Sequence, residues 1–493
     1  MKPKESTRSP LGSLAVQEPG GSRAFLTACA VIVIAAAVVR IAACMNGLWL
    51  DEIWTLTLLR TISSPLEIFT RLKVDNNHYL NTLYMYFFRD HGNWPGFRAL
   101  SVVTGLGAVV LAGLICRRDS RRSALTAMLL MACSYVMILY SSEARGYMPM
   151  VFFCLLGFLL LRRYLDKGGW WPALAFSACA ILGFLSQLLF LHFYLAALAW
   201  TAVRLWQNRR SVGGFILNLL RCHAVPLAFA AVLYFTQIRG MAVGGGVGAY
   251  TDRSVLEMFA WALGWTLSPP SDERWKLLAA VLAIYVLGVG LSRLRRQGDE
   301  LVFFAAAIVV VPLMFMLAWP VVPYVRYYLV PFVFMLLLLA KVLAQLGERK
   351  GVGKAAYALA IVALLVANGL QTATLLRVGR GQKIEALDYM ARNSRLQAIT
   401  VGGDHNFRVA TELSFYTGGF YKGRQVVYYE TPSWPRQGPE WIIVQTEADA
   451  PRSNILKEIG DINNNGYKLA AEFPCAELSG LRWYLYHNNN YGQ

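Results

Sequence analysis

The chain has 493 residues, of which 56% are hydrophobic, and its mean hydropathy is +0.42. Apolar stretches of 17–23 residues recur along it, which is the length of a helix that crosses a bilayer, so the sequence predicts an integral membrane protein. Its net charge of +18 would suit nucleic acid, but residues 378–493 carry 12 basic and 12 acidic side chains. The excess of basic residues therefore lies in short clusters between the apolar stretches, as the positive-inside rule describes. This distribution argues against nucleic acid as a partner.

Two adjacent carboxylates directly follow the first apolar stretch. Residues 1–23 are polar and predict a flexible cytoplasmic N-terminus, whereas Ala24–Met45 is too long for a cleaved signal peptide and predicts a retained first span. Asp51 and Glu52 come next, within Trp49–Trp54. Acids at the membrane edge are costly to place and indicate a functional site. The alternative is that this cluster only marks where a helix meets the lipid headgroups.

The basic clusters predict the topology. Those at residues 117–122, 162–167, 204–210, 293–296 and 341–350 should all be cytoplasmic. Helices between them must alternate, which gives eleven crossings and an external tail. The predicted spans are residues 24–45, 97–116, 123–140, 147–163, 171–187, 189–205, 214–236, 276–293, 301–319, 324–345 and 355–376.

Two longer connections remain outside the spans of this transmembrane domain, residues 24–376. They are the predicted external loops 46–96 and 237–275. The aromatic segment 79–88 is too short to span and predicts a helix lying at the outer surface; if it crosses as part of a pair, the count rises to thirteen. The glycine run at 244–246 lacks the Lys and Ser/Thr of a phosphate-binding loop and indicates a hinge or loop.

Residues 377–493 change character and predict a small external α/β domain. Asp404 and His405 are expected to lie at the surface, in the loop between a strand and a helix, and not to take part in catalysis. Asn463–Gly466 predicts a turn. The expected strands are residues 398–401, 426–429, 441–444 and 481–486, and the expected helices are residues 383–390 and 409–416.

On this topology the polar residues within or beside the spans converge on one membrane face, whereas the other face offers only solvated Arg and Lys clusters. The sequence therefore predicts a site at the outer face. Its expected residues are Asp51, Glu52, His78, Glu143, Arg145, Tyr147, His192, Arg326 and Tyr327.

This mixture has a chemical meaning. A carboxylate can accept a proton from an attacking hydroxyl, and Arg145 and Arg326 can hold a departing phosphate through paired donors. Because no nucleotide pool exists outside the cytoplasmic membrane, a sugar transfer there would need a lipid-linked donor. Structural alternatives stand beside these roles: Glu143 and Arg145 as an ion pair locking two helices, His192 as a hydrogen-bonded helix residue, and Arg326 extending to the headgroups.

The order of these motifs resembles that of the GT-C glycosyltransferases, in the bacterial branch related to protein O-mannosyltransferases and the aminoarabinose lipid A transferase. The motifs are Leu50-Asp51-Glu52, Asp75–His78, Ser141–Tyr147 and Arg326-Tyr327, and they cover residues 24–345. Where many relatives have His-Pro-Pro or Lys-Pro-Pro, this chain has His78 followed by Tyr-Leu-Asn. The tail matches only as a generic periplasmic domain.

The resemblance implies a polytopic α-helical enzyme of the bacterial inner membrane, with its active site and C-terminal domain on the periplasmic side. Asp51 would be the general base and Glu52 its orienting or acceptor-contacting neighbour. The implied partners are a polyprenyl-phosphate-linked sugar, the bilayer, and a lipid, glycan or protein acceptor. The donor would contact His78, Glu143, Arg145, Tyr147, His192, Arg326 and Tyr327.

No cofactor is assigned. Some members of the group use a divalent metal, but this chain offers no ligand set beyond Asp51, Glu52 and His78. Two other functions stay open. One is a lipid-sugar flippase or other transporter, which is expected to have polar residues at the bilayer midplane and internal repeats with broken helices. The other is a non-catalytic scaffold for envelope assembly, which would keep the fold without the chemistry.

Overall fold

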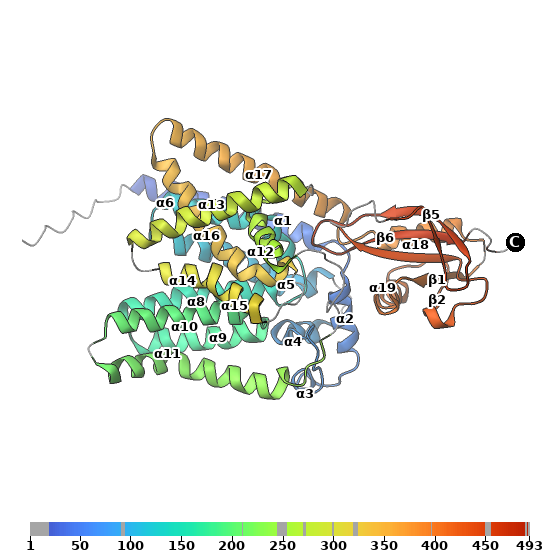
Figure 1. The fold of residues 1–493 in the computed structure, drawn as a ribbon, viewed down its shortest axis with the longest axis horizontal. Coiled ribbons are helices and arrows are strands. Elements are labelled where there is room, and N and C mark those ends of the chain that lie inside the picture. Colours follow the sequence, from blue (N-terminus) through green and yellow to red (C-terminus); the bar gives the residue numbers. More distant parts are fainter. Residues whose placement is uncertain are drawn as a thin grey trace, which may run out of the picture.

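The computed structural model describes residues 19–89, 94–209, 211–243, 254–269, 273–297, 300–318, 324–395, 397–448, 455–488 and 491. The glycine run at 244–246 and most of the predicted N-terminal segment lie outside these residues. The described chain forms an elongated molecule with a helical bundle at one end and a sheet domain at the other (Figure 1). The prediction of a helical membrane protein with a small C-terminal α/β domain is confirmed.

Each of the eleven predicted spans corresponds to helical structure. Most are single helices, but the third is the pair α6 and α7, and the seventh, ninth and tenth each include a short 3-10 or π segment. The helices are α1 (Pro19–Cys44), α5 (Trp94–Cys116), α6 (Arg121–Cys133), α7 (Tyr135–Ser141), α8 (Tyr147–Lys167), α9 (Trp170–Ser186), α10 (Phe190–Gln207), α11 (Val212–Leu233) with η2 (Tyr234–Ile238), α13 (Glu273–Gln297), α14 (Leu301–Ala305) with η4 (Ala306–Val310) and α15 (Val311–Ala318), η5 (Val325–Tyr328) with α16 (Leu329–Glu348), and α17 (Val352–Val378).

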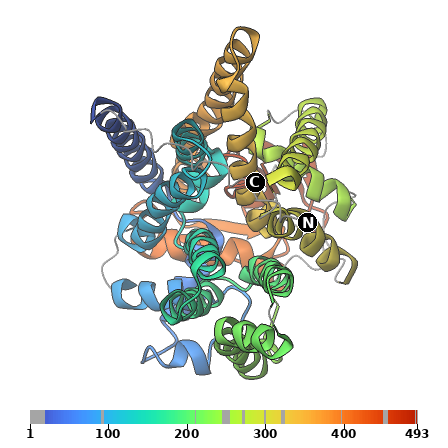
Figure 2. The ribbon, with the colours of Figure 1, turned by 90° about the vertical axis from the view of Figure 1, so that its left-hand side faces the viewer.

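Within the described residues, eight of these helical segments are long and apolar enough to cross a membrane, or nine if the bent pair of α6 and α7 counts as one span. The apolar helix α9 has only 17 residues. Burial separates the centre of the bundle from its edge: the apolar window of α16 is 83% buried, whereas those of α1 and α17 are 11% and 22% buried. In the view along the bundle, α1 and α17 project from its edge (Figure 2).

The break between α6 and α7 bends the chain by 60°. Ser134 caps the new helix, since its Oγ accepts a hydrogen bond from Met137 N at 3.4 Å. On the other side of the break, the buried Arg40 of α1 donates to the carbonyls of Met131 and Ala132 at 2.9 and 3.0 Å, which complements the negative end of α6. This bend directs α7 toward the turn that carries Glu143 and Arg145.

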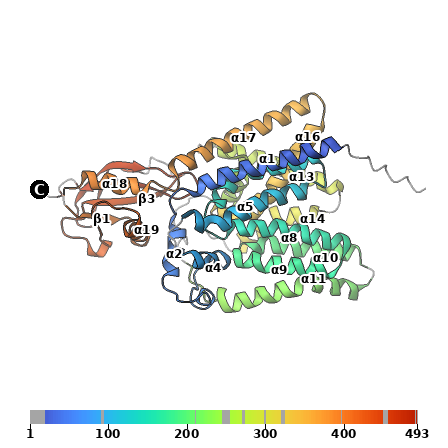
Figure 3. The ribbon, with the colours of Figure 1, turned by 180° about the vertical axis from the view of Figure 1, so that it is seen from behind.

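Four short helices lie outside the long ones: α2 (Leu50–Leu59), α3 (Glu67–Thr70), α4 (Tyr79–Phe88) and α12 (Val255–Gly264). The predicted helix at residues 79–88 is α4, with the expected bounds. Helices α2 and α4 lie at the end of the bundle that faces the sheet domain (Figures 1 and 3). Asp51 lies in the first turn of α2, and His78 directly precedes α4.

The sheet domain has six strands in the order β2-β1-β3-β6-β5-β4. β1 runs parallel to β2 and β3, and the remaining pairs are antiparallel. The four predicted strands and two predicted helices are present, but β4 and β5 were not predicted; β4 has only three residues, and Asn464 (φ 63°) lies in the connection between them. The elements are α18 (Lys383–Asn393), β1 (Ile399–Gly403), α19 (Asn406–Gly419), β2 (Val426–Tyr428), β3 (Trp441–Glu447), β4 (Glu458–Gly460), β5 (Gly466–Phe473) and β6 (Leu481–Asn488).

Candidate functional site

Glu52 is a fully buried structural carboxylate. It lies in the first turn of α2, where its Oε2 accepts a hydrogen bond from the backbone N–H of Trp49, the residue just before the helix, at 2.9 Å. Arg98 of α5 donates to both carboxylate oxygens, at 2.8 and 2.6 Å, and Ala144 N donates to Oε1 at 2.6 Å. Burial raises the pKa of Glu52, but the charge and hydrogen bonds of Arg98 outweigh it and lower this pKa. These contacts fix the start of α2 and the turn at Ala144, and the expected roles of Glu52, orienting Asp51 or contacting an acceptor, stay predictions.

Asp51 is the neighbouring acid and is more accessible. Its side chain is 17% exposed, and its Oδ2 lies 2.9 Å from Nη2 of Arg145. Within the described residues, no hydrogen bond reaches its second oxygen, Oδ1. The backbone of Asp51 is fixed, because its carbonyl accepts hydrogen bonds from Asn76 Nδ2 and Thr55 Oγ1, each at 2.9 Å. One carboxylate oxygen therefore remains available on a rigid helix turn.

The turn between α7 and α8, residues 142–146, presents Arg145 to Asp51. Four side chains, from α2, α5 and the start of α4, hold its backbone, so the turn is rigid without being regular structure. These contacts are Glu52 Oε1 to Ala144 N (2.6 Å), Asn81 Nδ2 to Ala144 O (2.6 Å), Ser101 Oγ to Arg145 O (3.2 Å) and His78 Nδ1 to Gly146 N (2.7 Å). The guanidinium of Arg145 is thereby preorganised, which is what an ion-binding group needs.

Gly146 is required by close packing. A Cβ at this position would lie 1.7 Å from the carbonyl oxygen of Ser186, at the end of α9, and 2.9 Å from His78 Nδ1. Its φ of −75° is ordinary for any residue, so the constraint is space and not backbone conformation. The turn can therefore approach α9 this closely only with glycine at position 146.

His78 is a buried neutral histidine. Because its Nδ1 accepts a hydrogen bond from Gly146 N, the ring proton is on Nε2. The side-chain amide of Gln187 faces that atom at 3.3 Å, and it must turn its oxygen toward Nε2 to accept. Burial and the charges of Arg145 and Arg326 hold the pKa of His78 well below its ordinary value. His78 thus positions the turn, and contact with a donor stays a prediction.

Arg145 and Arg326 converge on the indole of Trp49. Their Cζ atoms lie 5.8 and 5.7 Å from the centre of its ring. Arg145 also lies over Tyr147, at 4.7 Å, and Arg326 over Tyr324 and Tyr327, at 4.1 and 5.6 Å. Aromatic faces attract guanidinium groups but leave their N–H groups free for a ligand. Tyr147 and Tyr327 thus lie beside the two guanidinium groups, and their contact with a donor stays a prediction.

Both arginines retain donor capacity. Within the described part of the chain, Nε of Arg145 and Nε of Arg326 are buried and have no hydrogen-bond partner. No carboxylate of those residues pairs with Arg326, whereas Arg145 is shared with Asp51. Buried polar groups normally have hydrogen-bond partners, so two buried Nε–H groups without one indicate a ligand or ion that accepts hydrogen bonds from them.

Glu143 pairs with Arg380. Its carboxylate is buried and lies 3.6 Å from Nε of Arg380, the second residue after α17. At this distance burial outweighs the ion pair and raises the pKa of Glu143 to about 7. The alternative of a Glu143–Arg145 ion pair is wrong, because Arg145 pairs with Asp51 and Glu143 with Arg380. The predicted contact of Glu143 with a donor is untested.

His192 is not brought into this cluster. It lies in α10 with its ring 4.5 Å from that of Phe315 in α15. Its Nδ1 has no hydrogen-bond partner among the described residues, so the alternative of a hydrogen-bonded helix histidine is not supported through this atom. None of the contacts described for His192 reaches Asp51 or the two arginines, and its role at the donor stays a prediction.

The residues suggested for a metal do not fit one. Oδ2 of Asp51 is paired with Arg145, both oxygens of Glu52 are occupied, and Nδ1 of His78 accepts from Gly146. Among the described residues, no group of three His, Cys, Asp or Glu side chains is arranged to hold a metal ion. The cationic charge of this site comes from Arg145 and Arg326.

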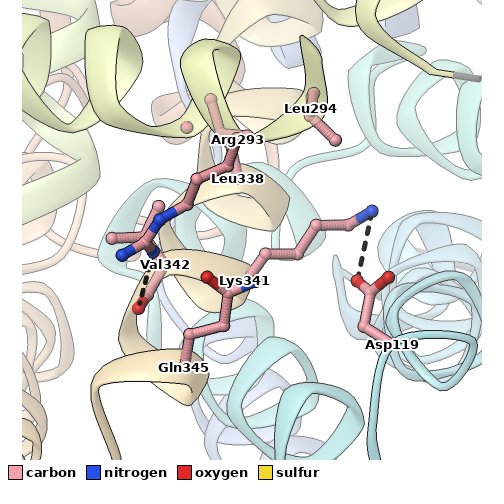
Figure 4. Close-up of a pocket in the computed structure, with 8 residues that line it drawn as sticks. Asp119, Arg293, Leu294, Leu338, Lys341, Val342 and Gln345 are labelled. Atoms are coloured by element: carbon pink, nitrogen blue, oxygen red, sulfur yellow. Dashed lines mark hydrogen bonds and ion pairs between the residues drawn. The ribbon is translucent and has the colours of Figure 1, made fainter. Parts of the chain in front are cut away.

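A second charged cluster lies at the other end of the bundle. Lys341 lies 12 residues, or about 18 Å at 1.5 Å per residue, after the start of α16 at Leu329, whereas Arg326 precedes that start in η5. It points to Asp119 at 3.2 Å, and Arg293 extends to the carbonyl of Val342 at 3.5 Å (Figure 4). The pocket that they line encloses about 10 Å³, which is room for about one water molecule. Because Lys341 also pairs with Glu300 at 2.9 Å, this cluster is a structural contact between helices.

Sequence reasoning missed the residues that build the site. Arg98 and Ser101 lie within the predicted span at residues 97–116, Asn81 within the predicted helix at 79–88, and Arg380 near the start of the predicted external domain. The sequence could have indicated Arg98, because a charged residue within a predicted span is expected to have a specific partner. Its pairing with Glu52, 46 positions away, required the fold.

Comparisons with known proteins give structural likeness only. No family model matches the chain, and no curated protein matches it. ArnT from Cupriavidus metallidurans is similar in its apo structure, at 11% identity and a TM-score of 0.49, with 94% of this chain and 98% of that chain covered. Its structure bound to undecaprenyl phosphate is 12% identical, with a TM-score of 0.48, and the match covers 95% of this chain and 98% of that chain. A third similar structure is the archaeal oligosaccharyltransferase AglB from Archaeoglobus fulgidus, in complex with an inhibitory peptide and a dolichol-phosphate. It is 12% identical, with a TM-score of 0.48, and the match covers 87% of this chain and 70% of that chain.

Proposed function

We propose that this protein is a membrane glycosyltransferase that moves a sugar from a polyprenyl-phosphate donor to a lipid, glycan or protein acceptor at the periplasmic face of the bacterial inner membrane. The observation that carries the proposal is one juxtaposition. A partly exposed carboxylate with a free oxygen, Asp51, lies in the same cluster as Arg145 and Arg326, whose Nε atoms are buried and have no hydrogen-bond partner among the described residues. The sequence motifs supply the donor class through their resemblance to GT-C glycosyltransferases.

The charge balance of the cluster favours an anionic ligand. Arg145 and Arg326 bring two positive charges, Asp51 brings one negative charge, and His78 is neutral. The net charge of these four residues is therefore +1. A phosphate placed between the two guanidinium groups would accept charge-assisted hydrogen bonds from both and would satisfy donors that the protein leaves unpaired.

The reaction follows from these positions. An acceptor hydroxyl gives its proton to Asp51 Oδ1 as its oxygen attacks the anomeric carbon of the donor. The bond between that carbon and the phosphate oxygen breaks, and its electron pair leaves with the polyprenyl phosphate. Arg145 and Arg326 stabilise the negative charge that develops on this leaving group. A single displacement of this kind inverts the configuration of the anomeric carbon.

Glu52 and His78 do not react in this scheme. Each holds a backbone N–H of the turn that carries Arg145, and preorganised donors are worth more than flexible ones because they cost no reorganisation at the moment of reaction. Trp49, Tyr147 and Tyr327 surround the guanidinium groups with aromatic surface. The same surface suits a sugar face or the apolar tail of a lipid.

The test is donor choice by the purified protein. In nanodiscs it should release polyprenyl phosphate from a mixture of polyprenyl-phosphate sugars, followed by mass spectrometry, and should leave UDP- and GDP-sugars intact. Comparing envelope lipids, glycans and proteins with and without the gene would identify the acceptor. Efficient transfer directly from a nucleotide sugar would contradict the proposal.

A further inference from the structure

Arg380 joins the helical bundle to the sheet domain. It follows α17, where the chain leaves the bundle, and is only 1% exposed. Its Nη2 donates to Ser142 Oγ at 2.9 Å and to the carbonyl of Leu139 at 3.2 Å, and its Nε lies 3.6 Å from Glu143 Oε1. These contacts reach the end of α7 and the start of the turn that presents Arg145.

The backbone beside Arg380 is fixed to the sheet domain. The carbonyl of Gly379 accepts hydrogen bonds from Ala476 N at 2.9 Å and Ser479 Oγ at 3.3 Å. A Cβ at Gly480 would lie 2.5 Å from the carbonyl oxygen of Arg380, so the two segments are in close contact. Arg380 therefore cannot move away from the turn unless the loop before β6 moves with it.

The same domain contacts the segment that carries Asp51. Tyr416 of α19 donates to the carbonyl of Leu48 at 2.8 Å, just before α2 begins. The ring of Phe407 lies edge-on to that of Trp54 in α2, with their centres 5.3 Å apart. Both sides of the 2.9 Å Asp51–Arg145 contact are thus held by one domain.

We propose that Arg380 is a positioning residue, through which the sheet domain fixes the turn of residues 142–146 and hence the place of Arg145. It touches neither Asp51 nor Arg145, and it acts by restraining Ser142 and Glu143. The inference rests on the proposed function for the identity of the ligand. The mechanical part, that Arg380 orders the turn, does not depend on any ligand.

The experiment compares Arg380→Met with Lys383→Met. Lys383 is a matched control because it is also a buried cation of the sheet domain, 3.4 Å from Glu412 Oε1 and 3.0 Å from the carbonyl of Leu481, and has no described contact with the turn. Hydrogen exchange measured by mass spectrometry should be faster in peptides spanning residues 140–150 for Arg380→Met and unchanged there for Lys383→Met.

Binding of undecaprenyl phosphate is the second measurement. Arg380→Met should weaken it by about 2- to 30-fold, the range for residues that modulate a site without touching its ligand, whereas Lys383→Met should leave it unchanged. If Arg380→Met does not fold, Ser142→Ala removes only the Nη2–Oγ contact and should shift both measurements in the same direction.

The outcomes separate the two proposals. Equal exchange in the two Met variants would overturn the positioning role, as would faster exchange in Arg380→Met with unchanged affinity. If the wild type does not bind undecaprenyl phosphate, the proposed donor fails instead, and the exchange measurement alone decides whether Arg380 orders the turn.

Discussion

Replacing Glu52 by Gln tests which of the two adjacent acids is structural. The amide keeps the shape of the side chain but removes its charge, which leaves Arg98 buried without a counter-ion. It also places an NH2 group where Glu52 now accepts hydrogen bonds from Arg98, Ala144 and Trp49. At least one of these donors must lose its acceptor.

The expected cost is large. Removing one partner of a buried ion pair typically destabilises a protein by about 3–5 kcal/mol, because the remaining charge is uncompensated. Whole proteins are stable by only about 5–15 kcal/mol, so Glu52→Gln should lose a large share of its stability. Asp51→Asn is the matched control on the next residue. Its side chain is 17% exposed and its loss should cost much less.

The assay is thermal unfolding of both variants in the same detergent, together with the yield of folded protein. We expect a clearly lower midpoint for Glu52→Gln than for Asp51→Asn. The reasoning would be refuted if the two midpoints were equal, or if Asp51→Asn were the less stable protein, because the four hydrogen bonds to Glu52 would then have no energetic weight.

Further predictions concern the turn, the phosphate and pH. Arg145→Ala should weaken undecaprenyl phosphate binding by about 10- to 100-fold, since a hydrogen bond to a charged group is worth about 1.5–3 kcal/mol, whereas the exposed Lys468→Ala should not change it; equal affinities would contradict this. Gly146→Ala should abolish binding or folding, because its Cβ would overlap the Ser186 carbonyl; normal affinity in a folded variant would contradict the packing. Because Glu143 has a raised pKa of about 7 in the folded protein, its contribution favours folding at low pH and is lost as pH rises from 4.5 through 7, so Glu143→Gln should unfold with less dependence on pH than the wild type; an unchanged slope would exclude Glu143 as its source.

The helices of the bundle could be predicted because length and apolarity suffice to define a span. The predicted span at residues 123–140, by contrast, is two helices, and nothing in its composition predicts the bend. At that bend, Arg40 donates to the carbonyl of Met131, which is 91 positions away in the sequence. The sequence did not predict β4 and β5, because β4 has only three residues and Lys468 and Glu472 interrupt the apolar residues of β5. In the fold, β5 pairs with β6, and β4 pairs with β5.

The residue types of the site were predictable, but their contacts were not. Asp51 and Arg145 were each expected at one membrane face, and the structure pairs them. Glu52 and His78 were expected near the reacting groups, but both hold backbone N–H groups of the turn. Adjacent residues on a helix point in different directions, so Asp51 and Glu52 could differ in role although the sequence places them side by side.

The measurement that tests the central claim most directly is single-turnover transfer by Asp51→Asn from a polyprenyl-phosphate sugar, with undecaprenyl phosphate affinity measured on the same folded protein. Loss of a positioned base should slow transfer by about 10²–10⁴-fold, while affinity stays near that of the wild type because Arg145 and Arg326 hold the phosphate. A folded Asp51→Asn protein that transfers sugar at the wild-type rate would contradict the assignment of Asp51 as the general base.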